Sequence, residues 1–212
     1  VLGCLVQDKG RDTVSVLSDL LPEVILGIPL PVAMRWGAHK QPFVRPIHWL
    51  LALFGDSVVP FSLYGISSDR VTRGHRVLTQ SSDDLISGEC LSLSDPNGYE
   101  ELLQKGFVSV CFKSRQDAIK QYLVDGLKQE VSSIGQSLLE EVSFLVEWPV
   151  FIVGSFSKDY LSLPDAVLIQ TMVKHQKYFP IFEDGLTAQF LVVSDGATQI
   201  ETVRLGNERV LL

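Results

Sequence analysis

The sequence predicts a mixed α+β fold with largely antiparallel sheets and hairpins packed against helices. Amphipathic helical patterns alternate along the chain with short apolar runs that are typical of strands. Two pairs of such runs flank turn signals, Gly55-Asp56 and Asp184-Gly185, and each pair predicts an antiparallel hairpin. With 212 residues, 46% of them hydrophobic and 20% charged, the composition is that of a globular chain with a packed core.

The first 95 residues are expected to hold one helix and four strands. Asp12 is a candidate N-cap for a helix that ends in the glycine- and proline-rich residues 27–31, and Pro22 predicts a kink or two short helices. A polar segment without periodicity predicts a loop at residues 79–95. Runs of apolar and β-branched residues predict strands at residues 2–6, 45–54, 57–66 and 72–78.

Helices and strands alternate in the rest of the chain. Asp95-Pro96 opens a helix that Gly106 stops, a capping box at residues 114–117 opens another that Gly135 stops, and Pro164 suits the first turn of a third. Together with one more helical repeat, these signals predict helices at residues 97–105, 114–134, 138–148 and 164–174. The predicted strands are residues 107–112, 149–156, 178–182 and 189–194.

Charge is distributed unevenly over a chain whose net charge is -7. Residues 34–80 contain six basic and two acidic residues, whereas residues 81–147 contain twelve acidic and five basic ones. A locally basic surface allows an acidic protein to meet a polyanion. A solvated face without a ligand has the same pattern, so charge alone does not decide between the two.

The usual catalytic motifs are missing from the sequence. It has no phosphate-binding glycine loop, dinucleotide fingerprint, serine-hydrolase elbow or zinc-protease motif, and no two histidines are spaced to share a helix face. We therefore predict no catalytic residue and no metal site. Cys4, Cys90 and Cys111 are expected to be reduced thiols in the core. The longest apolar run, residues 47–54, is too short to cross a bilayer.

Two compact clusters of basic side chains are candidate binding residues. The first lies at residues 68–76 around a glycine, which permits close approach of a ligand to the backbone. The second lies at residues 174–179, at the C-terminal end of a predicted helix, where basic side chains also complement the helix dipole. The basic residues of the two clusters are Arg70, Arg73, His75, Arg76, Lys174, His175 and Lys177.

Six motifs follow one another in an order that one family shares. They are Met34-Arg35-Trp36-Gly37, Phe43-Val44-Arg45-Pro46-Ile47-His48, and residues 65–76, 138–149, 174–180 and 206–210. With these motifs the chain resembles the bacterial glycyl-tRNA synthetase beta subunit from Gly10 onward, although residues 80–97 match nothing in the family pattern. Because no initiator methionine is present, we expect an internal fragment of that subunit.

The resemblance implies a fold and a set of partners. Residues 1–194 would form a module like the B3/B4 editing region of phenylalanyl-tRNA synthetase, as one body or as two lobes at about 1–112 and 113–194. Residues 195–212 would connect to a downstream HD-like domain. In the intact cytoplasmic enzyme, a heterotetramer or a fused alpha-beta chain, the alpha part would join glycine to tRNA(Gly) with ATP and Mg. The fragment itself would hold no cofactor and meet neither membrane nor DNA.

The resemblance also implies that basic side chains of the fragment contact the tRNA backbone, with Trp36 or Tyr178 able to stack on an unpaired base. The candidate residues are Arg35, Arg45, Arg70, Arg73, His75, Arg76, Lys174, His175 and Lys177. Two alternatives stay open. One is an editing-like hydrolase of mischarged tRNA, which glycine, the smallest amino acid, makes less necessary. The other is a purely structural spacer, whose arginines pair with carboxylates inside the protein.

Overall fold

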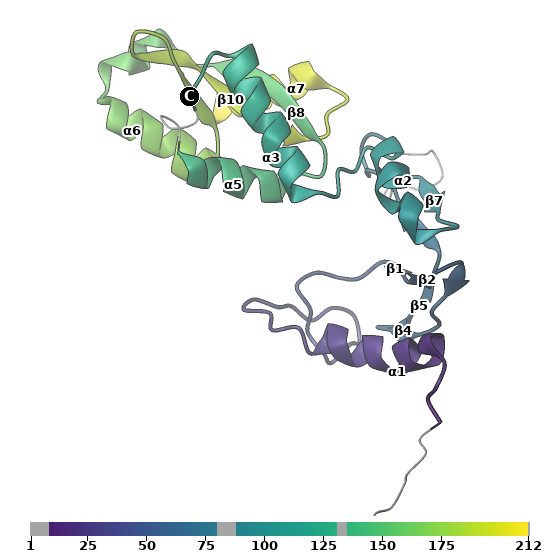
Figure 1. Ribbon diagram of the computed structural model, residues 1–212. Helices are drawn as coiled ribbons and strands as arrows, with labels where there is room; N and C mark the ends of the chain where they lie inside the picture. The colour runs from purple at the N-terminus through teal and green to yellow at the C-terminus, as the bar shows by residue number, and fades with distance from the viewer. Residues whose placement is uncertain (1–8, 80–87, 131–134, 212) are drawn as a thin grey trace, which may run out of the picture. The chain divides into compact units, whose positions relative to one another are not determined.

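A computed structural model describes residues 9–79, 88–130 and 135–211, so the strand predicted at residues 2–6 lies outside the described residues. The chain divides into two compact units. The first unit contains residues 1–72 and 90–99, and the second contains residues 73–89 and 100–212. Both contain helices and small, open, mostly antiparallel sheets (Figure 1), which confirms the predicted mixed α+β class.

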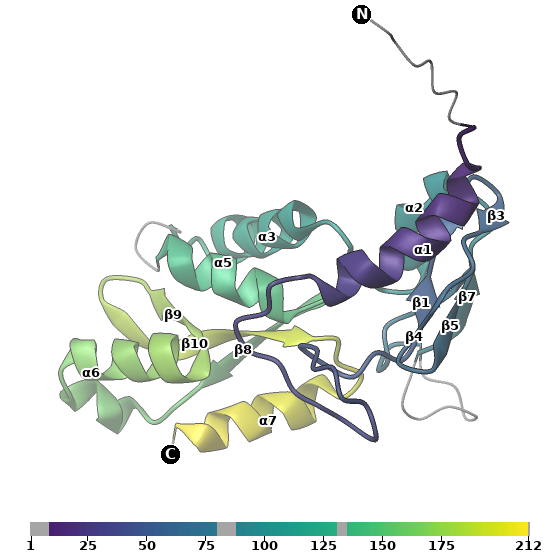
Figure 2. The ribbon, with the colours of Figure 1, turned by 90° about the horizontal axis from the view of Figure 1, so that it is seen from below.

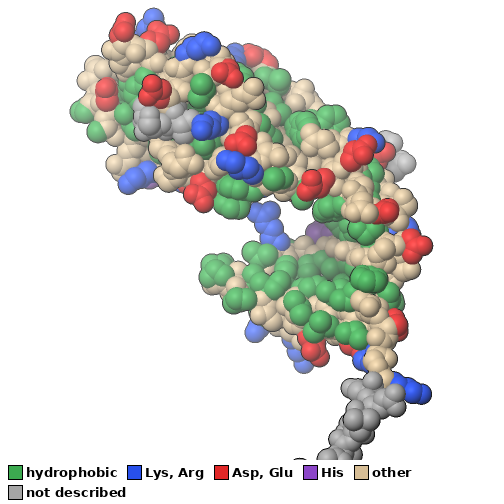
Figure 3. Space-filling view, viewed as in Figure 1, with side chains coloured by type: hydrophobic (Ala, Val, Ile, Leu, Met, Phe, Trp, Pro, Cys, Tyr) green, Lys and Arg blue, Asp and Glu red, His purple; other side chains and the backbone are tan. Residues whose placement is uncertain are grey.

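The first unit begins with helix α1 (Thr13–Leu26). Its N-cap is Asp12, as predicted, because the Asp12 carboxylate accepts a hydrogen bond of 3.0 Å from the Ser15 amide. Pro22 lies inside α1, yet α1 continues as one helix, so the alternative of two short helices is wrong. No residue of α1 is buried, and hydrophobic side chains gather on the visible face of this unit (Figure 3).

Short strands are the main secondary structure in the rest of the first unit. Strand β5 pairs in parallel with β1 and antiparallel with β4, β6 pairs with β7, and β2 with β3 form the hairpin predicted at Gly55-Asp56. The strands are much shorter than predicted. They are β1 (Leu50–Leu51), β2 (Leu53–Phe54), β3 (Ser57–Val58), β4 (Ser62–Leu63), β5 (Ile66–Asp69), β6 (Val71–Arg73) and β7 (Cys90–Ser92).

Two predictions around the junction of the units need correction. The strand predicted at residues 72–78 is present only at its start, since residues 76–79 form a turn. The loop predicted at residues 79–95 contains β7, while residues 80–87 lie outside the described residues. Asp95 is the predicted N-cap, because its carboxylate accepts from the Asn97 amide at 2.8 Å and opens the 3-10 turn η1 (Pro96–Gly98).

The second unit contains helices, two π-helical turns and three strands. The helical elements are α2 (Tyr99–Lys105), α3 (Phe112–Gln121), η2 (Tyr122–Gly126), α5 (Gln136–Leu145), η3 (Lys158–Ser162), α6 (Asp165–Gln170), η4 (Thr171–Gln176) and α7 (Ile200–Val210). The strands are β8 (Pro149–Ser155), β9 (Phe179–Phe182) and β10 (Leu186–Asp195). The predicted C-terminal hairpin is confirmed as β9–β10.

One strand predicted in this unit is absent, and one predicted helix has different bounds. No strand forms at residues 107–112, because the chain turns at Phe107, whose φ is +56°. Helix α3 begins at Phe112 with Cys111 as its N-cap, so the capping-box residues lie inside the helix rather than before it. The helical stretch leaves α-geometry at Tyr122 and ends as a π-helical turn at Gly126.

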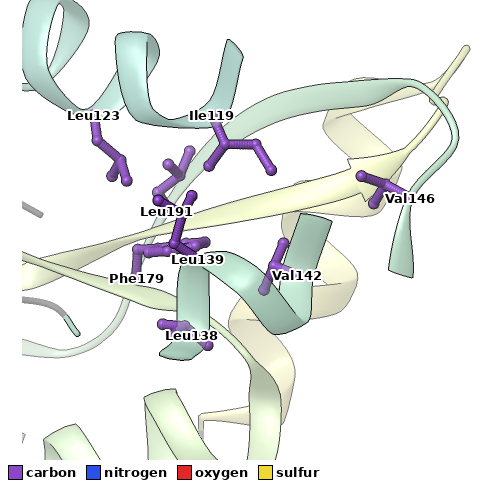
Figure 4. Close-up of a cluster of buried hydrophobic side chains, with 8 residues drawn as sticks. All are labelled: Ile119, Leu123, Leu138, Leu139, Val142, Val146, Phe179 and Leu191. Atoms are coloured by element: carbon purple, nitrogen blue, oxygen red, sulfur yellow. The ribbon is translucent and has the colours of Figure 1, made fainter. Parts of the chain in front are cut away.

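The core of the second unit is a sheet between two helical layers. The strand order is β8-β10-β9, all antiparallel, with α3 and α5 on one face and α6 and α7 on the other (Figure 2). Because neighbouring side chains of a strand point to opposite faces, Leu191 of β10 packs with Ile119 and Leu139 (Figure 4), whereas Val192 packs with Met172.

Helix α7 lies in the stretch that was predicted as a connector, and it is attached to the sheet by hydrogen bonds. The Glu208 carboxylate accepts from the amide and the hydroxyl of Ser155 at 2.9 and 3.1 Å. The Tyr178 hydroxyl donates to Asn207 Oδ1 at 2.7 Å. Across the described residues, no helix is long and apolar enough to cross a membrane.

Candidate nucleic-acid interface

Among the nine basic candidates, His75 is the only one with a buried side chain, since its exposed fraction is 1%. Tyr178, named above as able to stack on a base, is also buried, with an exposed fraction of 4%. The Nδ1 atom of His75 accepts hydrogen bonds from the amides of Val77 and Leu78 at 3.2 and 3.3 Å. Amide groups only donate, so Nδ1 carries no proton and Nε2–H donates to Asp195 Oδ1 at 3.2 Å. Both ring nitrogens are therefore occupied, and this arrangement does not support the RNA contact predicted for His75.

Asp195 joins three segments of the second unit. Besides the His75 ring, its Oδ1 accepts the amides of Glu147 and Trp148 at 2.6 and 3.1 Å. The neighbouring Gly196 has a φ of +61°, and a Cβ atom there would lie 2.3 Å from His75 Cε1. We call this arrangement the His75–Asp195 clasp. It fixes the segment after β6 to the end of β10 and the start of β8.

The clasp also has the spacing of a metal site, because ligand atoms of His75, Glu147 and Asp195 lie within 4.8 Å of one another. The residues do not fit a metal, however. A metal on Nε2 would need the lone pair of that nitrogen, but Nε2 holds the ring proton while Nδ1 receives two amide protons. The clasp is a structural contact in which both ring nitrogens of His75 already have hydrogen-bond partners within the protein.

The arginines of the first cluster differ in their surroundings. Arg70 is half-buried and donates to the carbonyl oxygens of Asp56 and Leu93 at 3.0 and 3.4 Å. Arg73 is half-buried and donates to the Gly88 carbonyl at 3.4 Å. Arg76 is exposed. Part of this cluster therefore holds the backbone, and Arg76 is the member most accessible to a ligand.

The second cluster lies at the end of η4. Lys174 and His175 are exposed on its last turn. Lys177 follows with a φ of +61°, and its Nζ pairs with a Glu141 carboxylate oxygen at 2.9 Å. An ion pair with this much solvent access contributes little to stability and remains open to competition by a phosphate.

The two remaining candidates, Arg35 and Arg45, are exposed side chains of the first unit. Arg70 also belongs to the first unit, whereas the other six candidates belong to the second. Lys174 and His175 lie on the last turn of η4, and Lys177 is the residue that caps it. Sequence reasoning missed Asp195, because 120 residues separate it from His75 and no local motif connects them.

These features define an α+β protein of two units, with exposed basic side chains in each. The family model for the glycyl-tRNA synthetase beta subunit matches residues 1–212, and the chain belongs to that family. The resemblance found in the sequence motifs is thus confirmed.

Curated relatives carry the same family name. The chain is 41% identical over 209 residues to the glycine–tRNA ligase beta subunit of Halothermothrix orenii, covering 96% of this chain and 29% of the relative. It is 39% identical over 211 residues to that of Clostridioides difficile, covering 97% of this chain and 29% of the relative. The beta subunit of Desulforamulus reducens is 39% identical over 215 residues, which cover 99% of this chain and 30% of the relative. The chain thus spans less than a third of the length of these relatives.

Proposed function

We propose that this chain is a non-catalytic region of a glycyl-tRNA synthetase beta subunit and helps to bind and position tRNA(Gly) for glycylation. In this proposal the alpha part, separate or fused, carries out the ATP-dependent reaction with Mg in the cytoplasm, and this region holds no cofactor. The family match supports the enzyme to which the chain is assigned. The observation that carries the binding role is the set of exposed basic side chains in a member of that family.

The proposed contacts are with the RNA backbone. Paired RNA is recognised mainly through its shape, phosphates and 2′-hydroxyls, which requires cations and hydrogen-bond donors rather than a pocket. Exposed guanidinium and ammonium groups meet this requirement, because their donors are free to turn toward a phosphate. The exposed candidates are Arg35, Arg45, Arg76, Lys174 and His175. Lys177 would join them by exchanging Glu141 for a phosphate.

The salt dependence of tRNA(Gly) binding to the intact enzyme tests this proposal. Each lost phosphate contact lowers the magnitude of the log–log salt slope by roughly 0.7–0.9, so Arg76→Ala with Lys174→Ala should lower it by about 1.5 and weaken binding. Lys120→Ala is the matched control, since Lys120 is also exposed but lies outside the candidate set. An unchanged slope and affinity in the double variant would contradict the proposal.

One observation favours the spacer alternative for part of the first cluster. Arg70 binds backbone carbonyls on both sides of its guanidinium, which is a structural task. The same salt titration decides between the roles: a spacer arginine leaves the slope unchanged when it is replaced, whereas a phosphate contact does not. For Arg70→Ala we expect a loss of stability with little change in slope.

A further inference from the structure

Three aromatic rings of the first unit form a compact group. The ring centroids of Trp36 and Tyr64 lie 4.7 Å apart, those of His39 and Tyr64 5.4 Å, and those of Trp36 and His39 5.6 Å. All three side chains are only half-buried. We call Trp36, His39 and Tyr64 the ring group. Each ring packs against the other two and keeps part of its surface in solvent.

Two tight backbone features hold the ring group. Trp36 and His39 lie in a loop closed by paired hydrogen bonds between Met34 and Phe43, at 2.7 and 3.0 Å. The His39 amide donates to the Trp36 carbonyl at 3.2 Å, which closes a turn between them. Tyr64 comes from the separate turn between β4 and β5, and its hydroxyl donates to the Pro42 carbonyl at 3.3 Å. The rings are thus placed before any ligand arrives.

Tyr64 occupies a backbone position that does not suit a tyrosine. In the two-residue turn between β4 and β5, Tyr64 has a φ of +53° and Gly65 a φ of +79°. A turn with two positive φ angles favours Asn, Asp or Gly at its first position, and a bulky residue there is strained because its Cβ atom crowds the backbone. Strain of this kind clusters at binding sites, so it points to a use for the ring.

The chain segment that carries Trp36 and His39 is rich in positive charge. Arg35 adjoins Trp36 and Lys40 adjoins His39, and both are exposed. Residues 24–55 contain these two cations and Arg45 but no acidic residue. Aromatic faces beside lysine and arginine are the combination by which proteins hold unpaired nucleic acid, because bases stack on the rings while the cations meet the phosphates.

We propose that the ring group binds an unpaired nucleotide of RNA, with its base stacked on Trp36 and the flanking phosphates on Arg35 and Lys40. The inference rests on the proposed function and deepens it, because it assigns an unpaired stretch of the RNA to the first unit. Stacking adds affinity that salt does not screen, whereas the phosphate contacts add affinity that salt does screen.

An acceptor-arm RNA hairpin, made with and without an unpaired 3′ tail, provides the test with the intact enzyme. Trp36→Leu should weaken binding of the tailed hairpin about tenfold, leave the blunt hairpin unchanged and leave the salt slope unchanged. Arg35→Ala should instead lower the slope for the tailed hairpin. Trp49→Leu is the matched control, since Trp49 is an exposed tryptophan outside the ring group.

Several outcomes would overturn the inference. If the enzyme binds both hairpins equally and Trp36→Leu changes neither, the ring group holds no nucleotide, while the proposed function stands. If the Arg76→Ala with Lys174→Ala variant also leaves the salt slope and the affinity unchanged, the inference and the proposed function are both contradicted. If Trp36→Leu weakens only the association with the alpha part, the ring group is a protein contact.

A second measurement keeps the test independent of variant folding. The wild-type enzyme is bound to the tailed hairpin with 4-thiouridine in the tail, and ultraviolet crosslinks are mapped by mass spectrometry. Crosslinks in residues 34–43 or at Tyr64 support the inference. Their absence, with crosslinks elsewhere in the enzyme, overturns it.

Discussion

The His75 ring satisfies hydrogen-bonding groups of three other residues, so its removal affects more than its own contacts. His75→Ala leaves the amides of Val77 and Leu78 and one acceptor position of Asp195 unpaired, and it opens a cavity beneath Gly196. We expect the free energy of unfolding to fall by about 2–4 kcal/mol.

Urea denaturation of the wild type and the variant measures this change. His48→Ala is the control, because His48 is exposed and its replacement should change the free energy by less than about 0.5 kcal/mol. Equal effects for the two histidines would show that the clasp contributes nothing.

The residue scale is also where the sequence informed us least. Local patterns predict caps such as Asp12 and Asp95, because both partners of a cap lie within a few residues. Local patterns do not predict that His75 contacts Asp195, because 120 residues separate the two. Cys90 and Cys111 were expected in the core but both are exposed, and Cys4 lies outside the described residues. Cys111 is the N-cap of α3, where hydrogen bonds from Ser114 lower the pKa of its thiol. A free cysteine is usually buried, and nothing in the neighbouring sequence indicates that Cys111 would be the N-cap of a helix.

At the scale of elements, the attachment of α7 to β8 should depend on pH. Burial by itself raises the pKa of Glu208, but hydrogen bonds from Ser155 and Arg204 outweigh it and hold the pKa below its usual range. A lowered folded-state pKa stabilises the protein above the unfolded value of about 4.3, and this contribution is lost as the pH falls below it.

Glu208→Gln should therefore cost about 1 kcal/mol at pH 7 and progressively less as the pH falls below about 4.3 and the wild-type carboxylate takes up a proton. Hydrogen exchange of the α7 amides against pH follows this change. Glu183→Gln, at an exposed carboxylate on the β9–β10 turn, is the matched control. A difference between Glu208→Gln and the wild type that stays constant with pH would contradict the assignment.

Elements with long patterns were the most predictable. The bounds of β8, β10 and α5 were predicted within a few residues. Each of these elements buries several apolar side chains, and these give the sequence a clear apolar run or helical repeat. The two-residue strands of the first unit have no such pattern, since a strand this short buries one side chain or none. Likewise, the apolar run after Gly106 predicts a strand, but a turn with a positive φ at Phe107 lies where that strand would begin.

For the whole molecule, we expect the two units to unfold separately. The described residues of the first unit bury only three hydrophobic side chains, Val59, Leu63 and Leu93, while Val32 is 79% exposed. The second unit packs both faces of its sheet. Hydrogen exchange in rising urea should show the amides of β4 and β5 losing protection before those of β10. Loss of protection at one common urea concentration would show a single cooperative unit.

The long sequence separation within the clasp has a consequence for biosynthesis. Asp195 follows His75 by 120 residues. At translation rates of about 5–20 residues per second, His75 is made roughly 6–24 s before its carboxylate partner Asp195. The segment that carries the imidazole must wait for the last strand of the sheet. The polypeptide after β6 is therefore among the last parts of the second unit to become ordered.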